Sequence, residues 1–162
     1  MPFSTDTQGR EEAIIALFRA TFIASEGASE GALIGELVRN LLASTAEQDH
    51  VVFTAEEEDA ILGGILFSRL TYAQDERTVF VLAPVAVATD QQGEGIGQRL
   101  LSHGLAALRS TGVDIVMIYG DPDYYAKVGF KTISEADAAA PFKLTVCQVS
   151  RMLRVTIRMH RC

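Results

Sequence analysis

The chain has 162 residues, of which 48% are hydrophobic and 22% charged, and its formal net charge is −7. This composition is that of a soluble globular protein and excludes disordered and fibrous classes. The length suits one domain, which we take as residues 1–162, and the acidic balance argues against a nucleic-acid-binding protein and favours cationic partners.

The sequence shows neither a secretory signal nor an apolar run long enough for a membrane span. The N-terminus has no basic segment followed by an apolar one, so a cytoplasmic location is expected. The longest apolar run, residues 79–88, is about half of what a membrane span needs. The two cysteines, Cys147 and Cys162, are too few for a disulfide scaffold, and no Cys or His spacing indicates a metal site.

The first part of the chain predicts two helices. Apolar residues at helical spacing predict a helix from Glu11 to Phe22, with Ile14, Ile15, Phe18 and Phe22 on its buried face. The segment EGASEG, residues 26–31, interrupts this pattern, and Ile34, Leu37, Val38 and Leu41 resume it. A second helix is therefore expected at about 32–43.

Strands dominate after His50. VVFTA and ILGGILFSRL predict two antiparallel strands joined by a turn at the acidic run 55–60, and residues 77–88 predict a third. The acidic run is interpreted as a solvated turn. Gly63 and Gly64 indicate a bulge, a close backbone approach or plain packing inside the second strand.

Helical spacing returns from Gly95 to Arg109, with Leu100, Leu101, Gly104, Leu105 and Leu108 on one face. A buried strand is then expected at 113–119, a short helix with Asp121 as its N-cap, and a further strand beginning at FKTI. LTVCQVS and LRVTIRM in the tail predict one or two more strands. The element order predicts an α/β domain.

The segment QQGEGIG, residues 91–97, stands between the strand at 77–88 and the helix at 95–109. Glycine allows backbone nitrogen atoms to approach an anion, and a helix N-terminus favours negative charge, so this turn predicts a phosphate site. A Walker A loop would need a Lys-Ser/Thr pair where Gln98 and Arg99 stand, and a dinucleotide fingerprint would need glycine at position 98. Both nucleotide loops are excluded by spacing.

The spacing of Gln92, Gly95 and Gly97 fits the pattern Q/R-x-x-G-x-G/A, and YYAKVGF (124–130) fits Y-x-K-x-G-F. Through these motifs the sequence resembles the GNAT superfamily of acyl-CoA-dependent N-acetyltransferases from about 51 to 133, and within it the YhbS-like predicted acetyltransferases. The resemblance implies a mixed, mostly antiparallel sheet with helices on both faces. It also implies a splay between the fourth and fifth strands, which admits the coenzyme.

The same resemblance implies the residues that bind acetyl-CoA, with no metal. The backbone of Val85, Ala86 and Val87 would pair with the pantetheine arm. The pyrophosphate would be held by the turn that follows Gln92, through the backbone N–H groups of Gly93, Glu94, Gly95, Ile96, Gly97 and Gln98. Arg99 and Lys127 are read as surface residues, although phosphate contact stays open. Many members of the superfamily have an asparagine where this chain has Ile118, so a hydrogen bond borrowed from that position is in doubt.

Tyr125 occupies the position at which many members place a tyrosine near the thioester sulfur. A phenol is protonated at neutral pH and can give a proton to the leaving thiolate, which makes Tyr125 the candidate general acid, with Tyr124 as its competitor. Asp121, Asp123 and the acidic residues 56–59 are candidate bases, and none is assigned. Cys147 is interpreted as a small buried residue and not as a nucleophile.

The expected function is direct transfer of an acetyl group from acetyl-CoA to the amine of a small molecule or a protein. The alternatives are a non-catalytic acyl-CoA sensor or interaction module, and an enzyme that acylates a hydroxyl group. The sequence does not identify the acceptor. The family resemblance leaves a homodimer open.

Overall fold

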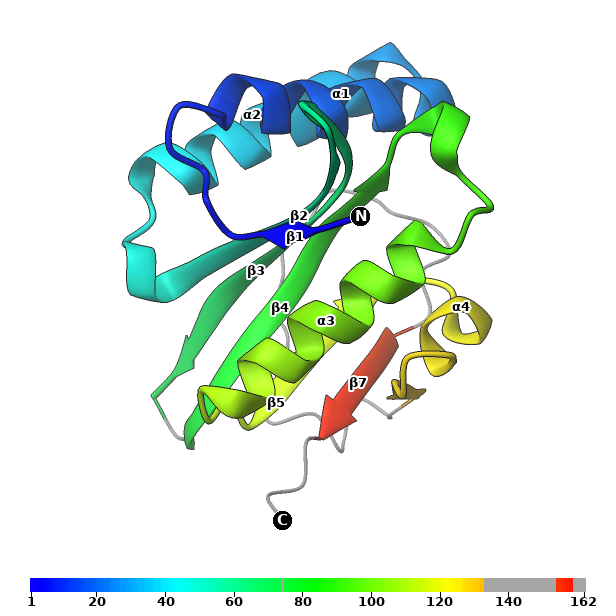
Figure 1. Ribbon diagram of the computed structural model, residues 1–162. Helices are drawn as coiled ribbons and strands as arrows, with labels where there is room; N and C mark the ends of the chain where they lie inside the picture. Colours follow the sequence, from blue (N-terminus) through cyan, green and yellow to red (C-terminus); the bar gives the residue numbers. More distant parts are fainter. Residues whose placement is uncertain (74, 133–153, 159–162) are drawn as a thin grey trace.

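The computed structural model describes residues 1–73, 75–132 and 154–158, which form a seven-stranded sheet with helices packed against it (Figure 1). The α-helices are α1 (Glu11–Glu26), α2 (Ala28–Ser44), α3 (Ile96–Ser110) and α4 (Pro122–Ala126). Two 3-10 turns are η1 (Glu47–Asp49) and η2 (Thr89–Gln91). The strands are β1 (Phe3–Ser4), β2 (His50–Glu57), β3 (Ala60–Tyr72), β4 (Asp75–Val87), β5 (Ile115–Tyr119), β6 (Lys131–Thr132) and β7 (Arg154–Arg158).

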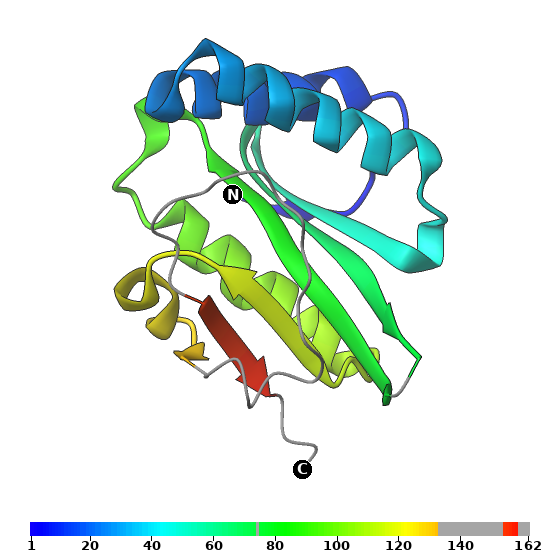
Figure 2. The same ribbon diagram turned by 180° about the vertical axis from the view of Figure 1, so that it is seen from behind.

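The sheet is mixed, with the order β1-β2-β3-β4-β5-β7-β6. The β4–β5 pair is parallel, and the other neighbouring pairs are antiparallel. Alternate residues of the central strands face opposite cores: Phe53 packs with α3, whereas Val52 packs with α1 and α2. The two views in Figures 1 and 2 show α3 on one side of the sheet and the α1–α2 pair on the other. The predicted fold class is confirmed.

The parallel pairing of β4 with β5 covers only part of β4. It runs from Val79 and Ile115 to Leu82 and Ile118, whereas β4 remains paired with β3 as far as Val87. Pro84, just beyond the last β5 pair, has no N–H group to give to a ladder. The strands therefore part after Leu82, and the last residues of β4 have a neighbour on one side only.

The two N-terminal helices are longer than predicted, and α2 begins at Ala28 and not at about residue 32. Gly27, with φ of +99°, is the residue that separates them. Gly31 lies inside α2. Glycine is needed there because α1 packs so closely that a side chain would overlap Ile23. The spacing of apolar residues predicts a helix break at this glycine, because a sequence pattern does not show that two helices approach each other closely.

The faces of these two helices also differ in part from the expectation. Thr21 is buried on α1 and Phe22 is only partly buried, and Leu37 of α2 is 41% exposed. By contrast, each residue predicted for the buried face of α3 is buried. The strand expected at 113–119 begins at Ile115, and LRVTIRM contains β7. LTVCQVS, Cys147 and Cys162 lie outside the described residues.

The glycine pair in β3 is explained by packing. A side chain at Gly64 would lie 3.0 Å from the Phe18 ring, and one at Gly63 would lie 3.3 Å from the carbonyl oxygen of Ala86. Against β4, the register of β3 shifts further along, between Ile65 and Phe67 and near the hairpin end. Against β2, it shifts directly beside Gly63, because Ala55 pairs with Gly63 and Glu56 pairs with Ile61. Gly63 therefore lies beside a bulge and close to the backbone of β4, whereas Gly64 makes room for the Phe18 ring.

Substitution of Gly104 tests how closely α3 packs on the sheet. A Cβ atom at this position would lie 2.8 Å from Ile65 Cδ1 and 3.1 Å from the Phe67 ring. Gly104→Leu should lower the free energy of unfolding by about 1–3 kcal/mol through overpacking. Urea denaturation measures this, with Ser102→Leu at an exposed position of the same helix as the control. Equal effects of the two substitutions would contradict the tight contact.

Candidate functional site

The glycine-rich loop after β4 depends on two residues with left-handed backbone. Gly93 has φ of +89°, and Gly95, the N-cap residue of α3, has φ of +73°. A Cβ atom at either position would meet no protein atom within 4 Å, so steric crowding does not require glycine there. The backbone conformation does, because L-residues with side chains disfavour this region.

This loop leaves backbone N–H groups free at the start of α3. The first backbone hydrogen bond from the helix runs from Arg99 N to Gly95 O at 3.1 Å. The N–H groups of Ile96, Gly97 and Gln98 therefore precede the regular helical bonding, and no side chain caps them. The helix dipole adds positive potential at the same place, so the loop and the first turn of α3 can hold an anion.

The unpaired end of β4 offers further main-chain groups. Ala88 N donates to Leu62 O at 2.8 Å, which directs residue 88 toward β3. Main-chain groups alternate along a strand, so Ala86 also faces β3, and Val85 and Val87 face the gap toward β5. Ala86 is 2% exposed, and its side chain packs with the α1–α2 core. Of the three residues expected to pair with pantetheine, two turn their main chain toward the gap.

The carbonyl group of Val87 joins three elements. It accepts a hydrogen bond from Thr21 Oγ1 of α1 at 3.3 Å and another from Gln92 Nε2 of the loop at 3.1 Å. The Gln92 side chain therefore holds the loop against the end of β4. Among the main-chain groups of Val85 and Val87 that face the gap, this carbonyl is already engaged.

The short helix α4 carries Tyr125 on the opposite side of the gap. Asp121 Oδ1 accepts from Asp123 N at 2.9 Å, which confirms Asp121 as the N-cap. The Tyr125 ring lies where a side chain on Gly120 would be, and it meets the Phe130 ring edge-on at 5.7 Å. Burial, the neighbouring Tyr124 and the Asp121 carboxylate raise the pKa of Tyr125 to about 12. The phenol is therefore protonated at neutral pH.

Tyr124 lies beside Tyr125, with ring centroids 5.0 Å apart, and reaches the first turn of α3. A side chain on Gly97 would overlap the Tyr124 hydroxyl oxygen, so the hydroxyl group lies against the Gly97 backbone. Gln98 Nε2 donates to the Tyr124 carbonyl oxygen at 3.0 Å. Consecutive residues of α3 thus determine where α4 lies.

A cavity of about 560 Å³ joins these parts. It brings together the loop, the end of β4 and both tyrosines. Its lining residues are Thr21, Val85, Val87, Gln91, Gln92, Gly93, Gly95, Ile96, Gly97, Gln98, Tyr124, Tyr125 and Lys127.

Two of the expected site residues do not line this cavity. Ala86 is buried on the other face of β4, and Glu94 lines a separate hollow with Asp90 and Arg99. Thr21 was missed by the sequence analysis. The one available signal was a polar residue three positions after Phe18 on an otherwise apolar helix face.

The charged side chains near the site differ in whether they face the cavity or hold the surrounding structure. Lys127 is exposed and lines the cavity, whereas Arg99 donates through Nη2 to the Glu94 carbonyl oxygen at 3.3 Å and so holds the loop. Glu56 is paired with Arg10 and accepts from Thr54 Oγ1 at 2.6 Å. The Arg10 hydrogen bond in particular lowers the pKa of Glu56. Glu56 is therefore a structural carboxylate and not part of a solvated turn.

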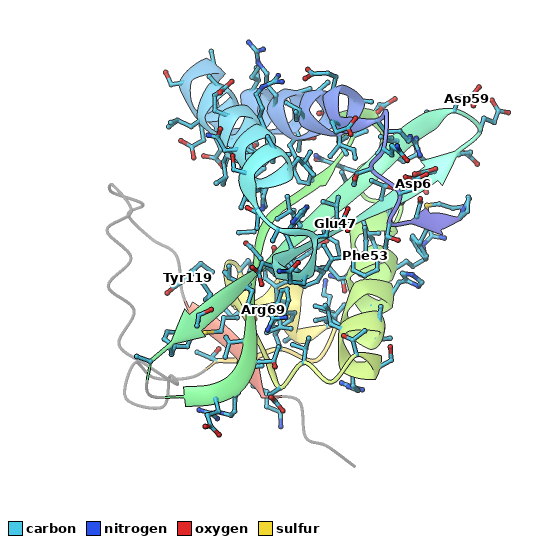
Figure 3. All side chains as sticks on the ribbon, turned by 90° about the vertical axis from the view of Figure 1, so that its left-hand side faces the viewer. Asp6, Glu47, Phe53, Asp59, Arg69 and Tyr119 are labelled. Atoms are coloured by element: carbon cyan, nitrogen blue, oxygen red, sulfur yellow. The ribbon has the colours of Figure 1, made fainter. Side chains whose placement is uncertain are left out.

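A second cavity differs from this one in its lining. A second cavity of about 340 Å³ is lined partly by Glu47, Phe53 and Arg69, which lie close together in Figure 3. Arg69 there is already ion-paired with Asp49 at 2.9 Å. Asp59 lies at the tip of the β2–β3 hairpin in the same view. Within residues 1–73, 75–132 and 154–158, no cluster of three or more His, Cys, Asp or Glu side chains is arranged to hold a metal.

No helix in the described part of the chain combines the length and the apolar character needed to cross a membrane. A mixed sheet whose central parallel strands part beside a glycine-capped helix places free N–H groups, an open strand edge and two phenols in one cavity. The chain belongs to the acetyltransferase (GNAT) domain family, which matches residues 48–132.

Among the similar proteins is the uncharacterized N-acetyltransferase YjhQ of Escherichia coli K12, which is 35% identical over 96 residues. That match covers 58% of this chain and 53% of YjhQ, so the chain spans about half the length of the curated relatives it matches. Among solved structures, a GNAT family acetyltransferase from Brucella melitensis in complex with acetyl-CoA is 32% identical. Its TM-score is 0.72, and the match covers 81% of this chain and 82% of that one.

The YhbS acetyltransferase from Escherichia coli in complex with CoA shares the fold, with a TM-score of 0.76 and 21% identity. The match covers 97% of this chain and 80% of that one.

The contact between Gly97 and Tyr124 can be tested by stability measurements. Gly97→Ala should lower the free energy of unfolding by about 1 kcal/mol, because the added methyl must displace the Tyr124 hydroxyl group. In a Tyr124→Phe background the nearest remaining atoms are at 3.4 and 3.7 Å. The same alanine should then be neutral or should stabilise the helix by up to about 1 kcal/mol. A double-mutant cycle by urea denaturation measures the coupling, and additive effects would contradict the contact.

Proposed function

We propose that this protein is an acyltransferase that moves an acetyl group from acetyl-CoA to an amine, by direct attack in a ternary complex. The observation that carries the proposal is one cavity that joins the N–H groups at the start of α3, the open edge of β4 and a protonated phenol. The acetyl-CoA found in the Brucella melitensis relative supports the choice of donor. Family membership supports the type of reaction.

In this proposal the loop and the first turn of α3 hold the diphosphate of the coenzyme. Gly93, Gly95, Ile96, Gly97 and Gln98 line the cavity and offer main-chain groups, whereas Gln92 acts by fixing the loop to β4. The pantetheine arm lies along the gap-facing main chain of Val85 and Val87. Glu94 contributes its N–H group and not its side chain, and Ala86 supports the strand from the α1–α2 core.

The chemistry begins when the neutral amine attacks the thioester carbonyl carbon and ends when the carbon–sulfur bond breaks. Tyr125 gives its proton to the departing sulfur, and the nitrogen loses a proton to solvent or to a base. A thiol has a pKa of about 8.5, so proton transfer from a phenol with a pKa of about 12 is uphill taken alone. Loss of the proton from the positively charged nitrogen in the same step drives the transfer, and Tyr125 recovers its proton afterwards.

The acceptor is an amine on a small molecule or a protein, and the base that takes its proton is left unassigned. Asp121 is engaged as the N-cap of α4, and Glu56 is engaged by Arg10. Among the described residues that line the cavity none is Asp or Glu, so a water chain to solvent suits this site better than a direct carboxylate base. The overall charge of −7 favours a cationic acceptor.

Release of the free coenzyme A thiol from acetyl-CoA across a panel of amines tests the function. We expect amine-dependent release by the wild-type protein and a fall in kcat of about 100-fold in Tyr125→Phe, because the proton donor is removed. The affinity for coenzyme A should be unchanged in this variant, as measured by isothermal titration calorimetry.

Full turnover by Tyr125→Phe would show that the assigned role of Tyr125 is incorrect. Binding of acetyl-CoA without thiol release for any amine would favour a non-catalytic sensor. Release only with hydroxyl acceptors would assign the enzyme to a different acceptor class.

The two glycines with φ of +73°, Gly9 and Gly95, provide a matched pair for the diphosphate site. Alanine at either position should cost about 1–2 kcal/mol of stability, since both positions have open space and the same φ. Only Gly95→Ala should weaken coenzyme A binding, by about tenfold, because its strained loop misaligns the N–H groups. Calorimetry on both variants measures this. Equal coenzyme A affinities of the two variants would show that the loop is not part of the binding site.

A further inference from the structure

The Tyr124 side chain is a feature of the cavity that the proposed chemistry does not use. Tyr124 comes from α4, on the β5 side of the gap, yet its hydroxyl group lies against Gly97 in the first turn of α3. The same point is close to β4, because a Cβ atom on Gly97 would lie 3.4 Å from Val87 Cγ2. The Tyr124 side chain therefore reaches from α4 to the junction of β4 and α3.

This junction lies between the two parts of the coenzyme site proposed above. The free N–H groups at the start of α3 are on one side, and the gap-facing main chain of Val85 and Val87 is on the other. A ligand that follows both must pass the Tyr124 hydroxyl group at the point where its diphosphate joins its pantetheine arm. A phenol at this place can donate one hydrogen bond to a phosphate oxygen.

The local contacts support a donor role for this hydroxyl group. Burial raises the pKa of Tyr124, partly opposed by the Gln98 side chain, so the phenol is protonated at neutral pH. Gln98 Nε2 also holds the Tyr124 carbonyl oxygen at 3.0 Å, which fixes the end of α4 to α3. The Tyr125 ring packs edge-on against the Tyr124 ring and limits its movement on the other side.

We propose that Tyr124 is a coenzyme-binding residue whose hydroxyl group donates a hydrogen bond to the diphosphate, with Gly97 leaving the space for it. This inference rests on the proposed function. It divides the two adjacent tyrosines into separate roles: Tyr124 binds the coenzyme, and Tyr125 acts on the sulfur.

Tyr124→Phe and Tyr125→Phe form the matched pair that tests this division. Tyr124→Phe should weaken coenzyme A binding about tenfold, the effect of losing one hydrogen bond to a charged group, and raise KM for acetyl-CoA with kcat unchanged. Tyr125→Phe should lower kcat and leave the affinity for coenzyme A unchanged. Calorimetry with coenzyme A and steady-state kinetics with acetyl-CoA measure both, and thermal unfolding verifies that each variant is folded.

Gly97→Ala reaches the same hydroxyl group from the α3 side. It should weaken coenzyme A binding in the wild-type background and cause no further loss in Tyr124→Phe. An equal further loss in that background would assign the effect to the added methyl group and would count against the proposal.

The failures of the two proposals are distinguishable. A wild-type protein that binds no coenzyme A contradicts the proposed function. A wild-type protein that binds coenzyme A, with an equal affinity in Tyr124→Phe, overturns the role of Tyr124 alone. A loss of kcat without a loss of affinity in Tyr124→Phe also overturns it, because the residue would then act in the chemistry.

Discussion

The site depends on a mismatch in the length of strand pairing around β4. On one side β4 is paired with β3 as far as Val87, and on the other its pairing with β5 ends at Leu82. A strand held by one neighbour keeps its shape while its other edge stays open. This arrangement provides fixed main-chain donors and acceptors at the edge of a cavity.

The other parts of the cavity are fixed relative to this edge by a few contacts. Gln92 ties the loop to the Val87 carbonyl oxygen, and Thr21 ties α1 to the same atom. Across the gap, Gln98 and Gly97 determine where α4 lies. A helix as short as α4 is not stable alone, so its tyrosines are positioned by its neighbours. The glycine loop, the open strand edge and the two phenols are therefore parts of one packed unit.

Much of the fold was predictable because its signals are local. The face of α3, the three long strands and the N-cap at Asp121 follow from periodicity and capping, and each is confirmed. The predicted start of α2 was wrong, because Gly31 resembles a helix break in the sequence but allows a close contact with α1 in the structure. Leu37 fits the helical spacing but is 41% exposed, because spacing alone does not show which side of α2 faces α1.

The candidate site likewise has parts that were predictable from local sequence and parts that depend on long-range contacts. The sequence by itself determined the glycine loop and the start of α3, because left-handed turns and free N–H groups are properties of a short segment. The sequence also limited the candidate proton donors to two adjacent tyrosines, Tyr124 and Tyr125. Only the tertiary structure decided that Val85 and Val87, and not Ala86, turn their main chain toward the gap. The same is true of Thr21 in the cavity and of the Tyr124 hydroxyl group at Gly97, because these contacts join residues far apart in the chain.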